Sequence, residues 1–206
     1  MNQHLNRKVK SLQNFDYYSG RLPSDTLKEV KDLCQTYHNE SNSKPYNDKL
    51  AGFIQDEYLL TDETDEITNL IMPHIYEGAC ALFEQPLMKW KLDSGWVNYQ
   101  KKYEINPLHN HSGLMSFAIW INIPYDINEE LNLPYVKDST IKKSATAFTF
   151  VYSDIHGTLR QQPFRIDKRG EGKFVVFHSQ LYHMVYPFYT SDGYRISIAG
   201  NISPKN

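Results

Sequence analysis

Hydrophobic and polar positions follow a helical period in the first part of the chain. Pro23 suits the first turn of a helix, and apolar residues then recur at spacings of three and four. These residues are Leu27, Val30, Leu33, Cys34 and Tyr37. A polar stretch rich in Asn and Ser follows over 39–48, so we expect the helix to end there.

The same period predicts a second helix before Pro86. Thr61 or Asp62 can cap its start, and Pro86 stops it. The apolar face of this helix comprises Ile67, Leu70, Ile71, Ile75, Ala79, Leu82 and Phe83. Pro73 falls inside the pattern and predicts a kink or a break.

The pattern changes at Trp90, where short runs rich in Val, Ile, Phe, Tyr and Trp begin to alternate with turn residues. Such runs are typical of strands. We expect strands near 95–101, 114–123, 145–152, 173–177 and 194–202, with Asp192-Gly193 marking a turn before the last one. The polar segment 124–144 is interpreted as an insertion, either a lid over a site or an ordinary surface loop.

Helices followed by many short strands predict an α+β chain that is mainly β. Residues 1–89 would be mostly helical support for a β-sandwich or jelly roll built from residues 90–206. The early helices have no obvious core of their own. We therefore expect a single domain over 1–206.

Composition excludes several classes of protein. The formal net charge of −2 provides no basic footprint for a nucleic acid duplex. Cys34 and Cys80 lie far apart, so we expect neither a disulfide framework nor a CxxC motif. The sequence shows neither the apolar stretch of a signal peptide nor a run long enough to span a membrane. A soluble, cytoplasmic protein is predicted.

Histidines carry the main chemical signal. His109 and His111 stand two apart, and in a strand such residues point to one face, where two imidazoles can chelate a metal. His183 ends an apolar stretch that begins at Phe177, and His178 could serve equally well on chemistry alone. A lone histidine is more often a satisfied core or surface residue. The others, His4, His38, His74 and His156, are interpreted in that way.

Arg195 and Ser197 form a second candidate pair. On a strand they share one face, and a guanidinium beside a hydroxyl can hold a carboxylate through parallel hydrogen bonds. The alternative is a surface ion pair made by Arg195 on an edge strand.

The order of these pieces is more specific than any one of them. Trp96-Val-Asn-Tyr99, His109-x-His111, an apolar strand, Phe177 to His183, and Arg195-x-Ser197 follow one another. In this order the chain resembles the Fe(II)- and 2-oxoglutarate-dependent oxygenases, in particular those carried by tailed phages of cyanobacteria and by marine bacteria. The resemblance covers roughly 90–202 and implies a double-stranded β-helix.

The resemblance also implies roles for residues. His109 matches the first ligand of the family's HxD pair, and His183 matches its distal histidine. Arg195 and Ser197 match the pair that binds the far carboxylate of 2-oxoglutarate, and Tyr99 matches a tyrosine that some relatives place against this cosubstrate. The implied cofactors are Fe(II) and 2-oxoglutarate. The implied reaction hydroxylates a small-molecule or side-chain substrate with release of succinate and CO2.

One departure concerns the second ligand, because His111 stands where the family has Asp or Glu. The site can have three histidines, or two histidines and an open position as in halogenase-like relatives. A carboxylate from elsewhere, such as that of Glu104, can also complete it. We favour three histidines and expect the added positive charge to strengthen binding of the dianionic cosubstrate.

Other classes of protein compete with this interpretation. A cupin-like three-histidine dioxygenase would need no 2-oxoglutarate, and it would have no use for Arg195-x-Ser197. A jelly-roll binding or structural module would hold no metal. A hydrolytic metal site ranks low because HExxH is absent. The pattern predicts neither the substrate nor the oligomeric state. If a phage encodes the chain, the expected location is the host cytoplasm.

Overall fold

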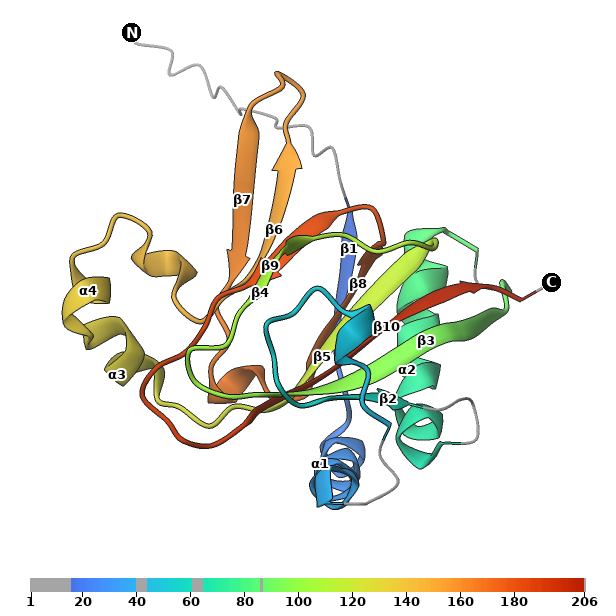
Figure 1. The fold of residues 1–206 in the computed structure, drawn as a ribbon. Helices are drawn as coiled ribbons and strands as arrows, with labels where there is room; N and C mark the ends of the chain where they lie inside the picture. Colours follow the sequence, from blue (N-terminus) through green and yellow to red (C-terminus); the bar gives the residue numbers. More distant parts are fainter. Residues whose placement is uncertain (1–15, 40–43, 61–64, 86, 206) are drawn as a thin grey trace, which may run out of the picture.

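Two antiparallel sheets form the body of the computed structural model, which describes residues 16–39, 44–60, 65–85 and 87–205 (Figure 1). The large sheet has the order β1-β8-β5-β10-β3-β2. Its strands are β1 (Tyr17–Arg21), β8 (Lys173–His178), β5 (Met115–Asn122), β10 (Arg195–Pro204), β3 (Trp90–Gln100) and β2 (Glu57–Leu60). The small sheet has the order β4-β9-β6-β7. Its strands are β4 (Asn106–His109), β9 (Tyr182–Val185), β6 (Phe148–Ser153) and β7 (Leu159–Phe164).

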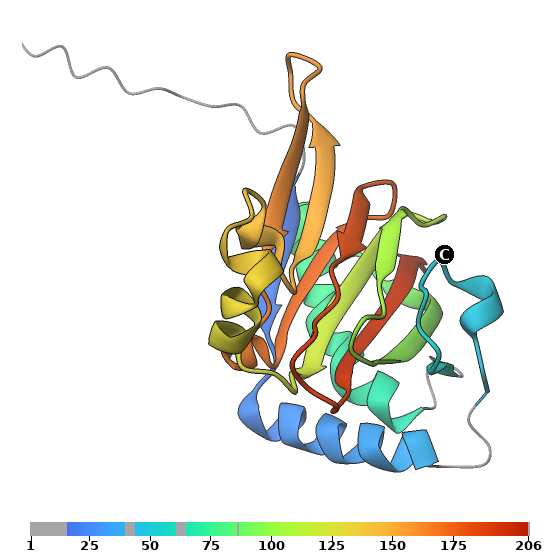
Figure 2. The same ribbon diagram turned by 60° about the vertical axis from the view of Figure 1, so that its left-hand side comes forward.

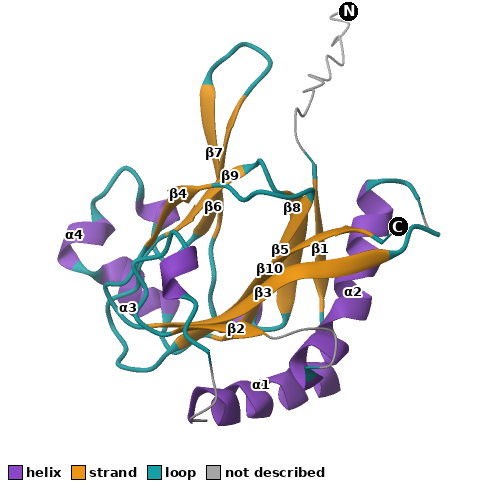
Figure 3. Cartoon of the chain, turned by 45° about the vertical axis from the view of Figure 1, so that its right-hand side comes forward, coloured by secondary structure: helices purple, strands orange, loops and turns teal. Residues whose placement is uncertain are grey.

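Two helices cover the face of the large sheet that lies away from the small sheet (Figure 3). They are α1 (Ser24–Asn39) and α2 (Glu66–Leu82). The expected apolar faces are confirmed, since Val30 and Cys34 of α1 and Ile71 and Ile75 of α2 are buried against the sheet. The expected α+β, mainly β architecture with supporting helices is therefore correct.

A second core fills the space between the two sheets. Neighbouring residues of a strand point to opposite faces, so on β5 Ile119 packs toward the helices while Trp120 packs toward the small sheet. Phe148 of β6 contacts both Trp120 and Phe177 of β8 in an aromatic cluster. Figure 2 shows the hairpin of β6 and β7 projecting from the rest of the two sheets.

All five expected strands are present, and five short ones were not expected. Two of the latter, β1 and β2, come from the part expected to be mostly helical and form the two edges of the large sheet. The others are β4, β7 and β9 of the small sheet. These strands span only four to six residues. Such lengths are too short to establish an alternating pattern, and β7 is polar and mostly exposed.

Two helical predictions need correction. The cap of α2 is Asp65, whose side chain accepts hydrogen bonds from the backbone N–H groups of Ile67 and Thr68. The expected caps at 61 and 62, and the expected stop at 86, lie outside the described residues. Pro73 causes no break, because α2 continues through it to Leu82. Among the described residues, no helix has both the length and the apolar character needed to cross a membrane.

The insertion over 124–144 contains no strand, as expected. It forms two short helices, α3 (Ile127–Asn132) and α4 (Pro134–Lys137), and then a 3-10 turn over Lys142–Ser144. The buried carboxylate of Glu130 in α3 accepts hydrogen bonds from the backbone N–H groups of Tyr189 and Thr190. The segment is thereby fastened to the chain that leads into β10.

Candidate metal centre

Three histidines meet where β4 and β9 pair in the small sheet. His109 ends β4 and stands opposite His183 of β9 in the ladder. His111 lies two residues beyond the end of β4. One ligand atom from each ring lies within 4.8 Å of the other two, and the ring centroids are 4.3–5.0 Å apart. Three imidazoles at this spacing can share one first-row metal ion.

Backbone carbonyls fix the tautomers of two of these rings. Nδ1 of His109 lies 2.7 Å from the carbonyl oxygen of Pro107, and Nδ1 of His183 lies 2.9 Å from that of Leu181. A carbonyl oxygen can only accept a hydrogen bond, so each Nδ1 carries the proton and donates it. The lone pair of each ring is then on Nε2. Metal-binding histidines are commonly oriented in this way by a partner on the other nitrogen.

Burial keeps the three imidazoles neutral. Desolvation lowers the pKa of His109, that of His111 to about 4, and that of His183 well below its usual value. The neighbouring His109 lowers the pKa values of His111 and His183 further. Only a neutral imidazole has a lone pair to offer, so all three rings are in the form that binds a metal.

His111 is positioned by a loop and not by a strand. Its backbone N–H donates to the carbonyl oxygen of Ser179 at 2.9 Å, and its own carbonyl accepts from Nε2 of Gln180 at 3.1 Å. Its ring stands beside Trp96, with centroids 5.6 Å apart. The sequence argument placed His109 and His111 on one face of a strand. That reason was wrong for His111, because β4 ends at His109, although His111 does reach the other two histidines.

No carboxylate joins this group within the described part of the chain. The carboxylate of Glu104 accepts instead from the backbone N–H groups of Gln55 and Lys101. His178, the other candidate ligand, is exposed, and its Nδ1 accepts from the backbone of Gln180. The donor set is thus three neutral nitrogens, which suits Fe(II) and other first-row metals.

Arg195 lies at the start of β10, an interior strand of the large sheet, and only 2% of its surface is exposed. Its Nε and Nη2 both donate to Oε1 of Gln100, at 3.0 and 2.7 Å. Nη2 also donates to the carbonyl of Tyr186, and Nη1 donates to the carbonyl of Thr146 and the hydroxyl of Tyr125. All these acceptors are neutral. Arg195 is therefore a buried cation that takes part in no ion pair among the described residues, which contradicts the alternative interpretation as a surface ion pair.

One cavity contains both features. The small sheet contributes His109 and His183, the loop after β4 contributes His111, and the large sheet contributes Arg195 and Ser197 from the opposite wall. Ser197 Oγ accepts from Nδ2 of Asn98 at 3.2 Å. The structure thus brings together five of the six residues singled out from the sequence.

Tyr99 is the sixth, and it lies on the other face of the large sheet. Its ring is buried toward the helices, and its hydroxyl donates to the carbonyl of Cys34 in α1 at 2.6 Å. The cavity is lined instead by its neighbours of even number on β3, Trp96, Asn98 and Gln100. Sequence reasoning missed Asn98 and Gln100, although their spacing of two from Trp96 places them on one strand face.

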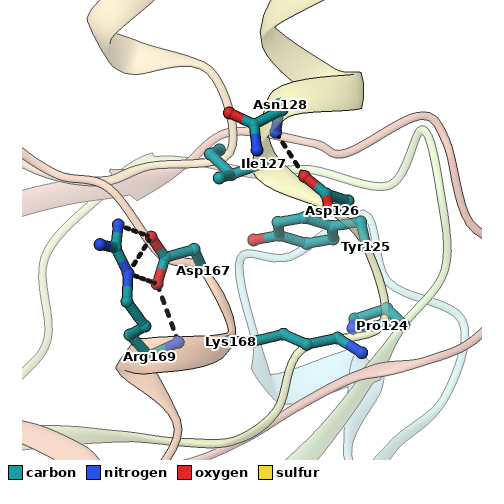
Figure 4. A pocket seen from close by; sticks show the side chains of 8 residues that line it. All are labelled: Pro124, Tyr125, Asp126, Ile127, Asn128, Asp167, Lys168 and Arg169. Carbon is teal, nitrogen blue, oxygen red and sulfur yellow. Dashed lines mark hydrogen bonds and ion pairs between the residues drawn. The ribbon is translucent and has the colours of Figure 1, made fainter.

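A second cavity, of about 590 Å³, lies beside α3 and is separate from the histidines (Figure 4). Tyr125 lines it, and so do Asp167 and Arg169, which pair with each other at 2.7 Å. Asp126 accepts from the backbone of Asn128. The acidic groups of this cavity are thus already engaged, and it contains no cluster of metal ligands among the described residues.

A family model described as "Putative 2OG-Fe(II) oxygenase" matches residues 94–201, more than half of the chain. No curated protein sequence matches.

Several solved structures share the fold at low sequence identity. A prolyl-4-hydroxylase from Pseudomonas putida aligns over 94% of this chain and 95% of its own, with 12% identity and a TM-score of 0.59. A viral collagen prolyl hydroxylase from Paramecium bursaria chlorella virus-1, in complex with 2-oxoglutarate, aligns over 90% and 94%, with 10% identity and a TM-score of 0.54. An oxidoreductase of the 2OG-Fe(II) oxygenase family from Burkholderia pseudomallei aligns over 90% and 84%, with 13% identity and a TM-score of 0.53. At these identities the likeness concerns the fold alone.

Proposed function

The chain belongs to the 2OG-Fe(II) oxygenase family, and from that premise we propose that it hydroxylates an organic substrate while converting 2-oxoglutarate to succinate and CO2. The observation that carries the proposal is the shared cavity, in which three neutral imidazoles face a buried, carboxylate-free Arg195. Fe(II) and 2-oxoglutarate are the cofactor and cosubstrate of the family.

In this proposal His109, His111 and His183 hold Fe(II) through three nitrogens. When bound together, Fe(II) and 2-oxoglutarate supply the activation of oxygen and the oxidising power. The chain fixes the donor atoms, because the carbonyls of Pro107 and Leu181 keep each Nδ1 protonated and each Nε2 available. The aromatic cluster behind His183 excludes water from that side.

A three-histidine set changes the charge of the site. Imidazoles bring no negative charge, so a bound Fe(II) keeps both positive charges, and the guanidinium of Arg195 adds a third on the opposite wall. A dianionic cosubstrate compensates for most of this charge. We therefore expect 2-oxoglutarate to bind more tightly here than to the same site with a carboxylate at position 111.

Arg195 and Ser197 would hold the far carboxylate of 2-oxoglutarate. Oε1 of Gln100 now accepts from both Nε and Nη2 of Arg195, and this is an edge of the guanidinium on which the two oxygens of a carboxylate can form parallel hydrogen bonds. We infer that the incoming carboxylate takes over this position and that the amide of Gln100 turns aside. The charged partner is favoured because a charge-assisted pair is stronger than a pair with a neutral amide.

The test is an anaerobic titration of 2-oxoglutarate into protein loaded with Fe(II), following the visible charge-transfer band of the chelate. We expect a saturable band in the wild type that His109→Ala, His183→Ala and Arg195→Ala weaken. His178→Ala is the matched control, since that histidine is exposed and lies outside the cavity. His111→Ala distinguishes a three-histidine site from a two-histidine site. The substitution weakens metal binding if His111 is a ligand and leaves it unchanged if His111 is not.

A cupin-like dioxygenase that does without 2-oxoglutarate is the competing function. It would bind Fe(II) and show no band with 2-oxoglutarate. The burial of Arg195 without a carboxylate favours the oxygenase, because a buried cation is costly unless an anion can reach it. A single domain over 1–206, a phage-encoded origin and a cytoplasmic location remain predictions of the sequence.

A further inference from the structure

The cavity leaves oxygen acceptors without donors. Oδ1 of Asn98 and Oδ1 of Asn106 both belong to residues that line the cavity, and both are buried without a hydrogen-bond partner. Asn98 is only 6% exposed. It comes from the large sheet and Asn106 from the small sheet, so the two amides approach the space from opposite walls.

A carboxyl group lies next to one of these amides, that of Asn98. Glu57 of β2 stands opposite Asn98 of β3 in the antiparallel ladder, and opposed residues project to the same face of a sheet. Glu57 therefore faces the side on which the cavity lies, next to Asn98, although Glu57 is not itself one of the residues that line the cavity. It is 1% exposed, and both of its carboxyl oxygens are buried without partners. Oε1 packs beneath Gly52, and Ile54 of the same loop lines the cavity.

Neither the metal nor the cosubstrate can satisfy these atoms. The proposed metal ligands are the three histidines, and the 2-oxoglutarate dianion carries oxygen acceptors but no N–H or O–H donor. A buried acceptor without a donor is costly, and buried carboxyl groups are normally paired. The substrate is the remaining ligand of the cavity, and N–H groups on it can supply these donors.

We propose that the substrate carries a cationic group rich in N–H donors, such as a primary ammonium, and that Glu57, Asn98 and Asn106 bind this group. The proposal rests on the proposed function and adds the chemical class of the substrate. An ammonium has three N–H donors and a positive charge. It can thus serve the two amide oxygens and the carboxylate at once. A neutral hydroxyl has one donor and brings no positive charge to favour the ionised form of Glu57.

The cavity then has two chemically distinct ends. Arg195, paired in the ladder with Gln100, supplies donors to an anion. Asn98 lies two residues earlier on β3, and with Glu57 beside it supplies acceptors to a cation. Glu57 and Arg195 form no ion pair with each other, so each keeps its capacity for a ligand.

The experiment compares three probes of the same chain length by anaerobic calorimetry on protein loaded with Fe(II) and 2-oxoglutarate. n-Pentylammonium has charge and donors, 1-pentanol has a donor without charge, and n-pentyltrimethylammonium has charge without donors. We expect n-pentylammonium to bind at least roughly tenfold more tightly than either of the others. Equal affinity for the three probes would overturn the proposal and would indicate that water alone fills the acidic end.

Variants assign the effect to the residues. Glu57→Gln should weaken n-pentylammonium binding roughly tenfold and leave the 2-oxoglutarate titration unchanged, whereas Glu129→Gln, at an exposed acid of α3, should change neither. Asn106→Leu gives a second reading should Glu57→Gln fold poorly. Undiminished binding in both variants contradicts the proposal.

A charge-transfer band without probe discrimination refutes this inference alone. Probe discrimination by metal-free protein that forms no band refutes only the oxygenase assignment.

Discussion

Glu57→Gln should make the protein more stable at high pH, which is the opposite of the usual effect of neutralising an acid. Burial, together with the nearby charge of Glu104, raises the pKa of Glu57 from 4.5 to about 7. The folded state therefore holds this proton more strongly than the unfolded state does. The stabilising contribution is complete below the unfolded pKa and is lost as pH rises toward the folded pKa. For a difference of about 2.5 pKa units the full loss is about 3 kcal/mol.

The assay is urea denaturation of metal-free wild type and Glu57→Gln at several values between about pH 5 and pH 8. Histidines and other groups titrate equally in both proteins, so the difference in unfolding free energy isolates Glu57. We expect this difference to shift by about 2–3 kcal/mol in favour of the variant across that range. Two parallel pH profiles would refute the reasoning, because they would mean that Glu57 ionises in the folded state as it does in the unfolded chain.

Three further predictions concern β3 and β10. Gln100→Glu gives Arg195 a permanent carboxylate partner in place of an amide, so 2-oxoglutarate should bind roughly tenfold more weakly in the chelate titration. Tyr99→Phe removes a buried hydrogen bond to Cys34 and should cost about 1–2 kcal/mol in urea denaturation while leaving that titration unchanged. Gly200→Ala would place a Cβ 2.5 Å from a backbone carbonyl oxygen of β3 and should lower the free energy of unfolding in urea denaturation by more than about 1 kcal/mol. A smaller decrease would contradict the close approach of the two strands.

The sequence predicted those parts of the fold in which a pattern extends over several residues. The helical period of apolar residues in α1 is sufficient to predict a helix, and the long hydrophobic run of β5 is sufficient to predict a strand. β9 has only four residues, and its place in the sheet depends on pairing with β4 and β6, which lie far away in the chain. Such non-local pairing leaves no local signal.

The alternation of side chains along a strand explains which residues the sequence assigned correctly to the candidate site and which it did not. On β10, Arg195 and Ser197 were assigned to one face, and both line the cavity. On β3, Tyr99 was assigned by its distance from His109, although strand alternation places it on the face opposite that of Asn98. A shift of one residue along a strand places the side chain on the opposite face of the sheet. The spacing of residues along the sequence does not tell which face of the sheet a residue occupies unless the pairing register of its strand is known.

The amides of β3 explain how one wall can keep a buried cation and a buried acid apart. Asn98 and Gln100 project from the same face, and each lies in the ladder beside a charged residue, Glu57 and Arg195 respectively. A direct pair between the two charges would satisfy both and leave nothing for a ligand. The amides instead keep Glu57 and Arg195 in separate rows of the ladder, where neither has a partner of opposite charge until a ligand enters. The wall thereby favours an anion at one end and a cation at the other, which orders two different molecules around a single metal centre.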